Sequence, residues 1–213
     1  MTGFGLLAVI SIAALIILVL VFLSGIRVIP NTRIGIVEKR FSPKGSVKSG
    51  FIALNGEAGF QPKVLRGGIH YLAPFQCVVH TAPLVTIPQG KIGYIFARDG
   101  KLLEPTQTLA SNEEVSDFQD VEAFLKNGGQ RGPQRRVLRE GTYAINLVQF
   151  IVLTDGRVYS LPLSREDMDV IQKMANVIAE RGGFFPVIIK DTDDKIGIAT
   201  VHDGPSLGQG EII

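Results

Sequence analysis

The sequence has a single cysteine, Cys77, among 213 residues. One cysteine excludes an intramolecular disulfide framework and agrees with a reducing compartment. Cys77 stands in the apolar stretch FQCVV, so we expect a buried structural thiol rather than a reactive one. The absence of a second cysteine also removes the usual thiolate pair of a metal site.

Histidines are also few, and they are scattered. His70, His80 and His202 have neither a spacing of four positions between them nor a second ligand type close by, which disfavours a metal site. The acidic run at residues 191–194 lacks the glycine and the terminal glutamate of a calcium-binding loop. We read this run as a solvated turn and expect no metal.

The familiar catalytic and nucleotide-binding motifs are missing. The glycine-rich stretch GGQRG at residues 128–132 lacks the Lys-Ser or Lys-Thr pair that follows a phosphate-binding loop. The sequence contains neither G-x-G-x-x-G after a strand nor a G-x-S-x-G nucleophile elbow. We therefore expect a protein that is not an enzyme and that needs no cofactor.

No charged residue precedes Arg27. Residues 3–26 form an apolar run that would be about 36 Å long as a helix, against about 30 Å for the hydrocarbon core of a bilayer. A cleaved signal sequence would have basic residues before a shorter apolar run, and soluble core helices are seldom apolar on every face. Residues 1–27 are thus predicted to be a transmembrane anchor.

The chain becomes strongly basic directly behind this run. Between residues 27 and 48 one acid, Glu38, is opposed by six basic residues, namely Arg27, Arg33, Lys39, Arg40, Lys44 and Lys48. Basic residues that flank a span stay on the cytoplasmic side, so we expect a single-pass protein of the cell membrane with its bulk in the cytoplasm. The six side chains are candidate contacts for lipid headgroups. The rest of the chain has a net charge of −3, which argues against a nucleic-acid surface.

The sequence repeats itself. IPNTRIGIV at residues 29–37 recurs as IPQGKIGYI at residues 87–95, an offset of 58, and a weaker third copy starts at residue 194. QPKVLRGG at residues 61–68 corresponds to QRRVLREG at residues 134–141, an offset of 73. The second offset is the larger of the two, which predicts an insertion in the second copy.

Short apolar and β-branched stretches after turn residues predict strands in each copy, at residues 33–37, 91–97 and 195–201. Asp99-Gly100 and Asp203-Gly204 each follow such a stretch, as hairpin turns do. We expect a β-rich module that is used more than once.

The insertion has the pattern of a short amphipathic helix over residues 118–127. Asp117 is placed to cap its start and Gly128 to end it. Its apolar residues share one helical face, which we expect to pack on the sheet of the second copy: Phe118, Val121, Phe124 and Leu125.

A longer amphipathic helix is predicted over residues 164–183. A sequence close to a capping box begins at Ser164, and Gly182-Gly183 ends the pattern. One stripe carries Met168, Ile171, Met174, Ala175, Ile178 and Ala179. Such a stripe packs on its own sheet more often than on a partner, so we expect a helix that covers the core.

Four arginines are concentrated in the stretch GGQRGPQRRVLREG: Arg131, Arg135, Arg136 and Arg139. Guanidinium groups and glycine amides both suit an anionic headgroup, a phosphate or an acidic partner. The favoured interpretation is a surface turn followed by a strand whose exposed side carries arginine.

The whole pattern resembles the SPFH or band 7 superfamily of stomatin, prohibitin and flotillin, and most of all its large bacterial flotillin-like members. The resemblance depends on the two Ile-Pro strand openers with their Ile-Gly pairs, on ALNGEAGF (53–60), on the turn before His70-Tyr71, and on DFQD (117–120) followed by GGQRGPQ (128–134). It implies a membrane scaffold that forms large homo-oligomers, organises lipids and membrane proteins into microdomains, and has no catalytic site. A regulatory subunit of a membrane protease is the alternative, and a membrane-bound hydrolase is the distant third.

The expected fold class is α+β, with an anchor at residues 1–27 followed by β-rich SPFH units with short covering helices. The units are residues 28–84 and 85–163, then the helix at 164–183, then the start of a third unit at 184–213. This third unit is incomplete, so its strand is expected to pair with an earlier sheet or a neighbouring subunit, or to belong to a longer polypeptide.

Overall fold

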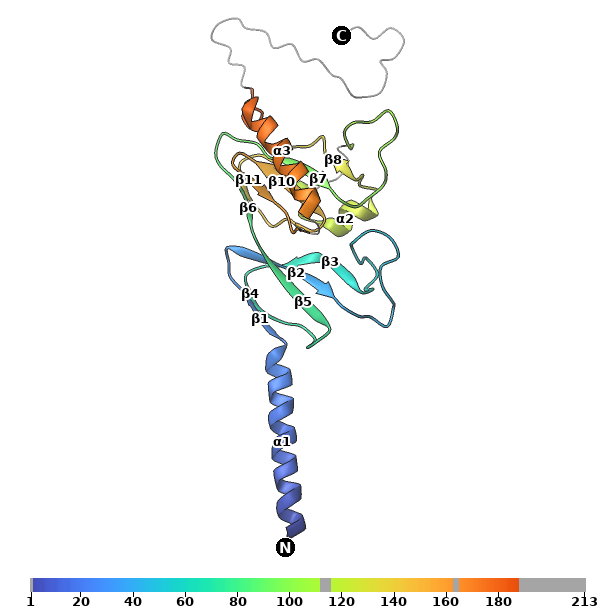
Figure 1. The fold of residues 1–213 in the computed structure, drawn as a ribbon, viewed down its shortest axis with the longest axis vertical. Helices are drawn as coiled ribbons and strands as arrows, with labels where there is room; N and C mark the ends of the chain where they lie inside the picture. Colours follow the sequence, from blue (N-terminus) through green and yellow to red (C-terminus); the bar gives the residue numbers. More distant parts are fainter. Residues whose placement is uncertain (1, 112–115, 163–164, 188–213) are drawn as a thin grey trace, which may run out of the picture. The chain divides into compact units, whose positions relative to one another are not determined.

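The computed structural model describes residues 2–111, 116–162 and 165–187 of the chain. It is a mixed α and β fold with an apolar N-terminal helix and several antiparallel sheets, which agrees with the predicted α+β class (Figure 1). The chain divides into two compact units, Met1–Leu84 and Val85–Ile213, called here the first and the second unit.

The first unit begins with helix α1, Thr2–Ser24, and contains two antiparallel sheets (Figure 1). Strands β1 (Ile26–Ile29) and β4 (Gly68–Tyr71) form a two-stranded ribbon. Strands β2 (Arg33–Lys39), β3 (Gly59–Leu65) and β5 (Cys77–Pro83) form a sheet with β2 in the centre. The strand predicted at residues 33–37 is confirmed.

Helix α1 is held against the ribbon by specific contacts. The Phe22 ring stacks on the Tyr71 ring at 5.0 Å between centroids. The backbone N–H of Leu72 donates a hydrogen bond of 2.9 Å to the Gly25 carbonyl. Because Gly25 lies against both Tyr71 and the Leu72 carbonyl, a Cβ there would come within 2.6 Å of them. The helix therefore ends directly on the β1–β4 ribbon.

The second unit repeats this plan with longer connections. Its ribbon pairs β6 (Val85–Ile87) with β9 (Gly141–Tyr143). Its larger sheet has the order β11-β10-β7-β8. The strands of that sheet are β7 (Tyr94–Ala97), β8 (Gly132–Pro133), β10 (Phe150–Thr154) and β11 (Arg157–Tyr159). Strand β7 begins at Tyr94, later than predicted, because Gly93 makes only an isolated bridge to Leu138.

The pairing register shows that the two units are copies of one module. In the first ribbon Ile29 lies opposite Gly68, and in the second Ile87 lies opposite Gly141. These positions differ by the offsets of 58 and 73 found in the sequence. The larger sheets agree as well, since the pair Ile36 with His80 corresponds to Tyr94 with Leu153.

A side-chain interaction is duplicated too. The Gln61 amide donates to the carbonyls of Glu57 and Gly59 at 3.3 and 3.0 Å. Its equivalent in the second copy, Gln134, donates to the carbonyls of Gln130 and Gly132 at 2.8 and 2.9 Å. The sequence repeat therefore reflects a repeated structure, down to one hydrogen-bonded side chain.

The insertion forms a helix, but a shorter one than predicted. A 3₁₀ turn, Ser116–Phe118, precedes helix α2, Val121–Lys126. The cap is Asp120, whose carboxylate accepts from the Ala123 N–H at 2.9 Å. Asp117 does not cap, because its backbone adopts a left-handed φ of 50° inside the 3₁₀ turn. The expected burial is confirmed for Phe118, Val121 and Phe124, whereas Leu125 is half-buried.

The predicted hairpin turn at Asp99-Gly100 is wrong. Strand β7 pairs with β10 and β8, and among the described residues no strand that follows Gly100 directly folds back on it. Gly100 lies instead against the Gly129 carbonyl, which a Cβ would overlap. The Asp99 side chain accepts from the Gly100 N–H at 2.8 Å, and the N–H of the next residue, Lys101, donates to the Gly129 carbonyl at 2.9 Å. The pair therefore lies beside the glycine-rich segment and does not reverse a strand.

Helix α3, Arg165–Glu180, packs on β10 through one part of the predicted stripe (Figure 1). Ala175 is buried with Ile151, Leu153 and Phe184, and Ile171 and Ile178 flank them. Met174 and Ala179 are exposed, contrary to prediction. The face of α3 that contacts the sheet is narrower than the apolar stripe in the sequence. The end at Gly182 is confirmed by a φ of 66°.

Some predictions fall outside the described residues, among them the Met168 side chain, the strand at 195–201 and the turn Asp203-Gly204. The same holds for His202, the acidic run at 191–194 and the cap at Ser164. Cys77, predicted to be buried, is half-buried at the start of β5.

Candidate functional site

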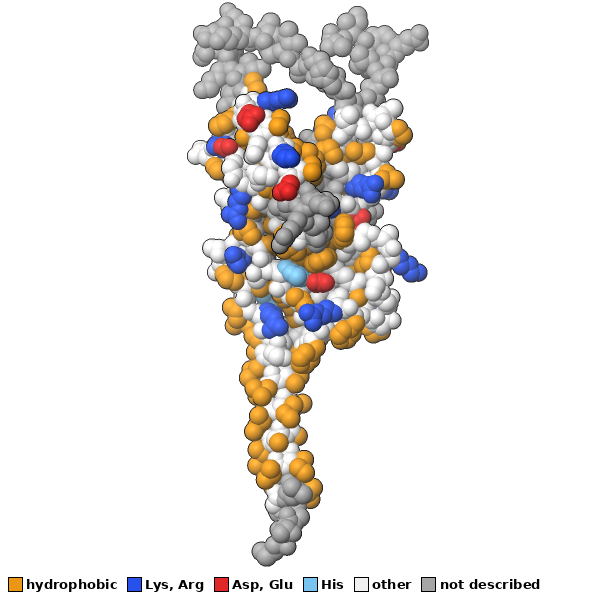
Figure 2. Space-filling model, viewed as in Figure 1, with side chains coloured by type: hydrophobic (Ala, Val, Ile, Leu, Met, Phe, Trp, Pro, Cys, Tyr) orange, Lys and Arg blue, Asp and Glu red, His pale blue; other side chains and the backbone are white. Residues whose placement is uncertain are grey.

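The C-terminal end of α1 is capped by the first basic residue of the chain. Arg27 donates from Nη1 to the Ser24 carbonyl at 2.7 Å and to the Ile26 carbonyl at 3.0 Å. A cation at this end complements the helix dipole and satisfies carbonyl groups that have no partner within the helix. From Leu7 to Leu23 the exposed side chains of α1 are apolar apart from Ser11 (Figure 2).

The six basic residues of the flank do not form one cluster. Arg33 and Lys39 stand at opposite ends of β2, which at 3.3 Å per residue separates them by about 20 Å. On the face drawn in Figure 2, Lys and Arg side chains are spread and do not gather into one patch.

Two of the lysines have a structural role in the loop after β2. Lys39 donates from Nζ to the Gly56 carbonyl at 2.9 Å and to Ser42 at 3.3 Å. Lys44 donates to the Asn55 carbonyl at 2.8 Å. These bonds tie the two arms of the loop at residues 42–58 together, so both lysines contribute to the loop as well as to its charge.

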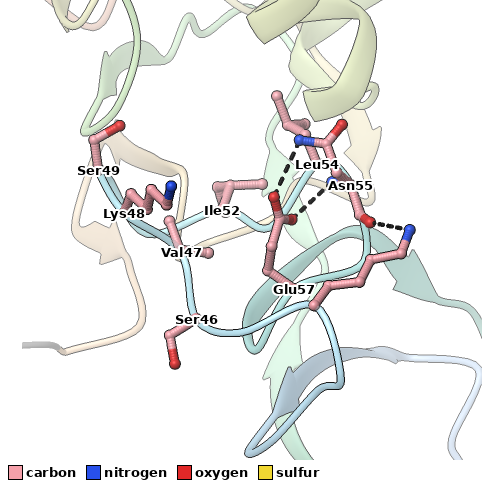
Figure 3. Close-up of a pocket in the computed structure, with 9 residues that line it drawn as sticks. Ser46, Val47, Lys48, Ser49, Ile52, Leu54, Asn55 and Glu57 are labelled. Carbon is pink, nitrogen blue, oxygen red and sulfur yellow. Dashed lines mark hydrogen bonds between the residues drawn. The ribbon is translucent and has the colours of Figure 1, made fainter.

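The loop encloses an open pocket of about 450 Å³ (Figure 3). Its lining combines lysines and serines with apolar side chains and one acid: Lys44, Ser46, Val47, Lys48, Ser49, Ile52, Leu54, Asn55 and Glu57. In Figure 3 the Glu57 carboxylate points toward Asn55 and is joined to it by hydrogen bonds.

Glu57 keeps its charge in this pocket. Hydrogen bonds from its own backbone amide and from the Asn55 side chain and backbone amide lower the pKa of its carboxyl. The carboxylate is ionised at neutral pH, where it offsets one of the neighbouring lysines, and the lowered pKa extends this to more acidic pH. The pocket is therefore mixed in charge, which makes it a poor site for a free anion.

The four clustered arginines of the second unit, Arg131, Arg135, Arg136 and Arg139, are all exposed. Arg136 pairs with Asp117 at 2.8 Å, and the hydroxyl of Tyr143 donates to the Arg139 carbonyl at 2.9 Å. Desolvation by burial raises the pKa of Tyr143. The predicted strand behind this turn is wrong, since β8 contains only Gly132–Pro133 and Leu138 makes an isolated bridge. The four arginines belong to this irregular segment and remain candidates for contact with an anion or an acidic partner.

Sequence reasoning missed an apolar surface beside the end of α1. Val28, Ile69, Tyr71 and Phe75 are large, exposed and all within the first unit. The only sequence signal is the aromatic residue in the turn APFQ at residues 73–76. The other three residues could not be found from the sequence, because the alternation of a strand does not show which face of a two-stranded ribbon is covered.

In the described part of the chain no three His, Cys, Asp or Glu side chains converge as metal ligands would. Comparisons with protein-family models, with curated protein sequences and with solved structures found no match.

Proposed function

We propose that this protein is a single-pass membrane scaffold of the SPFH type, which assembles with copies of itself and organises the lipids and proteins around it. The main support is the arrangement of the first unit. A helix long and apolar enough to cross a bilayer ends directly on the first of two copies of one β module. Such a protein holds the first copy of the module next to the membrane surface.

The distribution of charge agrees with this proposal. The first unit has eight Lys and Arg against two Asp and Glu, a formal charge of +6. The second unit has 14 basic and 18 acidic residues, a formal charge of −4. A positive unit next to the anchor suits the anionic inner leaflet, where each contacting Lys or Arg contributes about 1 kcal/mol. Membrane lipid and further copies of this chain are thus the proposed partners.

Electron microscopy of the full-length protein, in mild detergent and in native membrane, tests the scaffold. We expect rings or cages of many copies. Particles that contain one copy under both conditions would contradict the proposal. A membrane protease that co-purifies in fixed ratio would favour the regulatory-subunit alternative instead.

The proposed topology places all residues after Arg27 in the cytoplasm. Leu102→Cys in a Cys77→Ala background offers a suitable test, because the Leu102 side chain is exposed. Gly100 is unsuitable for this purpose since a Cβ there overlaps the Gly129 carbonyl. We expect a membrane-impermeant maleimide to label Leu102→Cys only after cells are lysed. Labelling in intact cells would show the opposite orientation.

A further inference from the structure

The first unit exposes a set of large apolar side chains that its own fold does not cover. Four of them make up what we call the apolar patch: Val28, 68% exposed, Ile69, 77%, Tyr71, 53%, and Phe75, 73%. Isolated apolar residues are normal on a protein surface, but a contiguous patch marks a contact with a partner or a membrane.

Val28, Ile69 and Tyr71 are contiguous and join α1, and Phe75 follows Tyr71 by four positions on the connection to β5. Val28 lies directly opposite Ile69 in the β1–β4 ribbon, so their side chains share one face. Tyr71 follows Ile69 by two positions and lies on the same face. The Tyr71 ring also stacks on Phe22 of α1, and Pro74 and Tyr71 border a shallow apolar pocket against Leu18 and Phe22.

Phe75 stands at the tip of the connection between β4 and β5. Its φ of 64° is in the left-handed region, which is strained for a bulky residue. A hydrogen bond of 2.8 Å from the Gln76 N–H to the Pro74 carbonyl closes the tight turn around it. Glycine would suit this backbone conformation better, and the exposed Phe75 ring adds little to the packing of the unit. The fold of the unit therefore does not explain why a phenylalanine is found here.

The second unit supplies a matched comparison. The pair equivalent to Val28 and Ile69 is Thr86 and Thr142, which also lie opposite each other and are also exposed. Val148, the equivalent of Phe75 at the offset of 73, is completely buried. The module therefore folds with a polar pair at these positions. The exposed apolar residues are a feature of the copy that is attached to α1.

We propose that the apolar patch docks into the interfacial layer of the bilayer, with Phe75 and Tyr71 at the level of the lipid headgroups. This inference rests on the proposed function, because it requires α1 to cross the same bilayer. Val28 follows the last residue of α1, Ser24, by four positions, which places it within about 13 Å of the helix end. Aromatic side chains are enriched at this depth, and the charge of +6 on the first unit adds attraction to anionic lipid.

A lipid surface fits better than a second copy of the chain. The patch is continuous with the surface of α1, which lipid surrounds in the proposed arrangement. Arg27, exposed on β1 beside Val28, agrees with a headgroup environment. By strand alternation Arg27 lies on the opposite face of the ribbon from Val28, so it borders the patch and does not interrupt it.

The sequence has no tryptophan, so each single Trp variant gives an unambiguous fluorescence signal. We would place the full-length protein in anionic vesicles whose lipids carry bromine either near the glycerol end or near the methyl end of the acyl chain. The test variants are Phe75→Trp and Ile69→Trp. Phe22→Trp reports the insertion of α1, and Thr142→Trp is the matched position of Ile69 in the second unit.

We expect bromine near the glycerol end to quench Phe75→Trp and Ile69→Trp, and to leave Thr142→Trp unquenched. Adding Val28→Thr and Ile69→Thr to Phe75→Trp should reduce that quenching, and it should not disturb folding because the second ribbon already carries a Thr pair.

The two proposals fail differently. If Phe22→Trp is quenched while Phe75→Trp and Ile69→Trp behave like Thr142→Trp, the docking inference is wrong and the anchor stands. If the fluorescence of Phe75→Trp and Ile69→Trp is protected from acrylamide but is not quenched by bromine, a second copy of the chain covers the patch. That result also overturns the docking inference. If Phe22→Trp is itself unquenched, α1 does not enter the bilayer and both proposals fail.

Discussion

Replacement of Phe124 by alanine is expected to lower the free energy of unfolding of the second unit by about 3 to 5 kcal/mol. The Phe124 ring packs edge-on against Phe150 at 5.0 Å between centroids, and Phe118 lies 5.3 Å from Phe150. All three rings are buried. Truncation leaves a cavity between α2 and β10 that neighbouring side chains fill only in part.

Hydrogen exchange measured by mass spectrometry can locate this effect. We expect faster exchange in β10 and unchanged exchange in β2, which belongs to the other unit and serves as the internal reference. Leu102→Ala, at an exposed position, should change neither. Unchanged protection of β10 in Phe124→Ala would mean that α2 contributes little to this core.

Gly129 provides a stricter test of the same contact. A Cβ at this position would lie 2.6 Å from three atoms of the Phe124 ring. Gly129→Ala should therefore destabilise the natural sequence and have a much smaller effect once Phe124 is alanine. The coupling energy of such a double-mutant cycle for residues in contact is commonly about 0.5 to 3 kcal/mol. Additive effects would show that the ring and the glycine do not meet.

The second large effect concerns α1. We expect the combined change of Leu15→Arg and Leu18→Arg to abolish membrane integration, because an arginine near the centre of a span costs about 3 kcal/mol. Both side chains are exposed and both lie in the central part of the helix. The matched control, Leu15→Ala with Leu18→Ala, preserves an apolar surface and should preserve integration.

Resistance of the membrane pellet to alkaline carbonate gives the readout. Retention of the double arginine variant at the level of the control would show that α1 is not the anchor. The intact mass of the natural membrane-bound protein distinguishes a retained anchor from a signal sequence, since cleavage after α1 would remove the whole of Thr2–Ser24.

The sequence by itself determined the features that depend on composition and on local pattern. The uncharged run became a helix, Thr2–Ser24, because backbone hydrogen bonds and an apolar surface need no partner from elsewhere in the chain. The offsets of 58 and 73 correctly identified strands that pair in the same register in both units. The two copies have the same pattern of apolar and polar residues along these strands, and that pattern sets the register. The membership of the SPFH superfamily stays a prediction.

Only the tertiary structure decided which of several local options was used. Asp117 and Asp120 are both good caps in sequence, and the buried Phe118 in a left-handed conformation shifts the helix start to Asp120. Asp99-Gly100 has the composition of a hairpin turn, but the close approach of Gly129 engages it instead.

The six flanking basic residues show the same limit. Their proximity in sequence predicts one surface, yet the extended geometry of β2 separates Arg33 from Lys39. Conversely, Val28 and Ile69 are far apart in the sequence and meet only because β1 and β4 pair. Whether an apolar side chain is covered depends on packing between distant segments, so the apolar patch beside α1 is a property of the fold and is invisible in the local pattern.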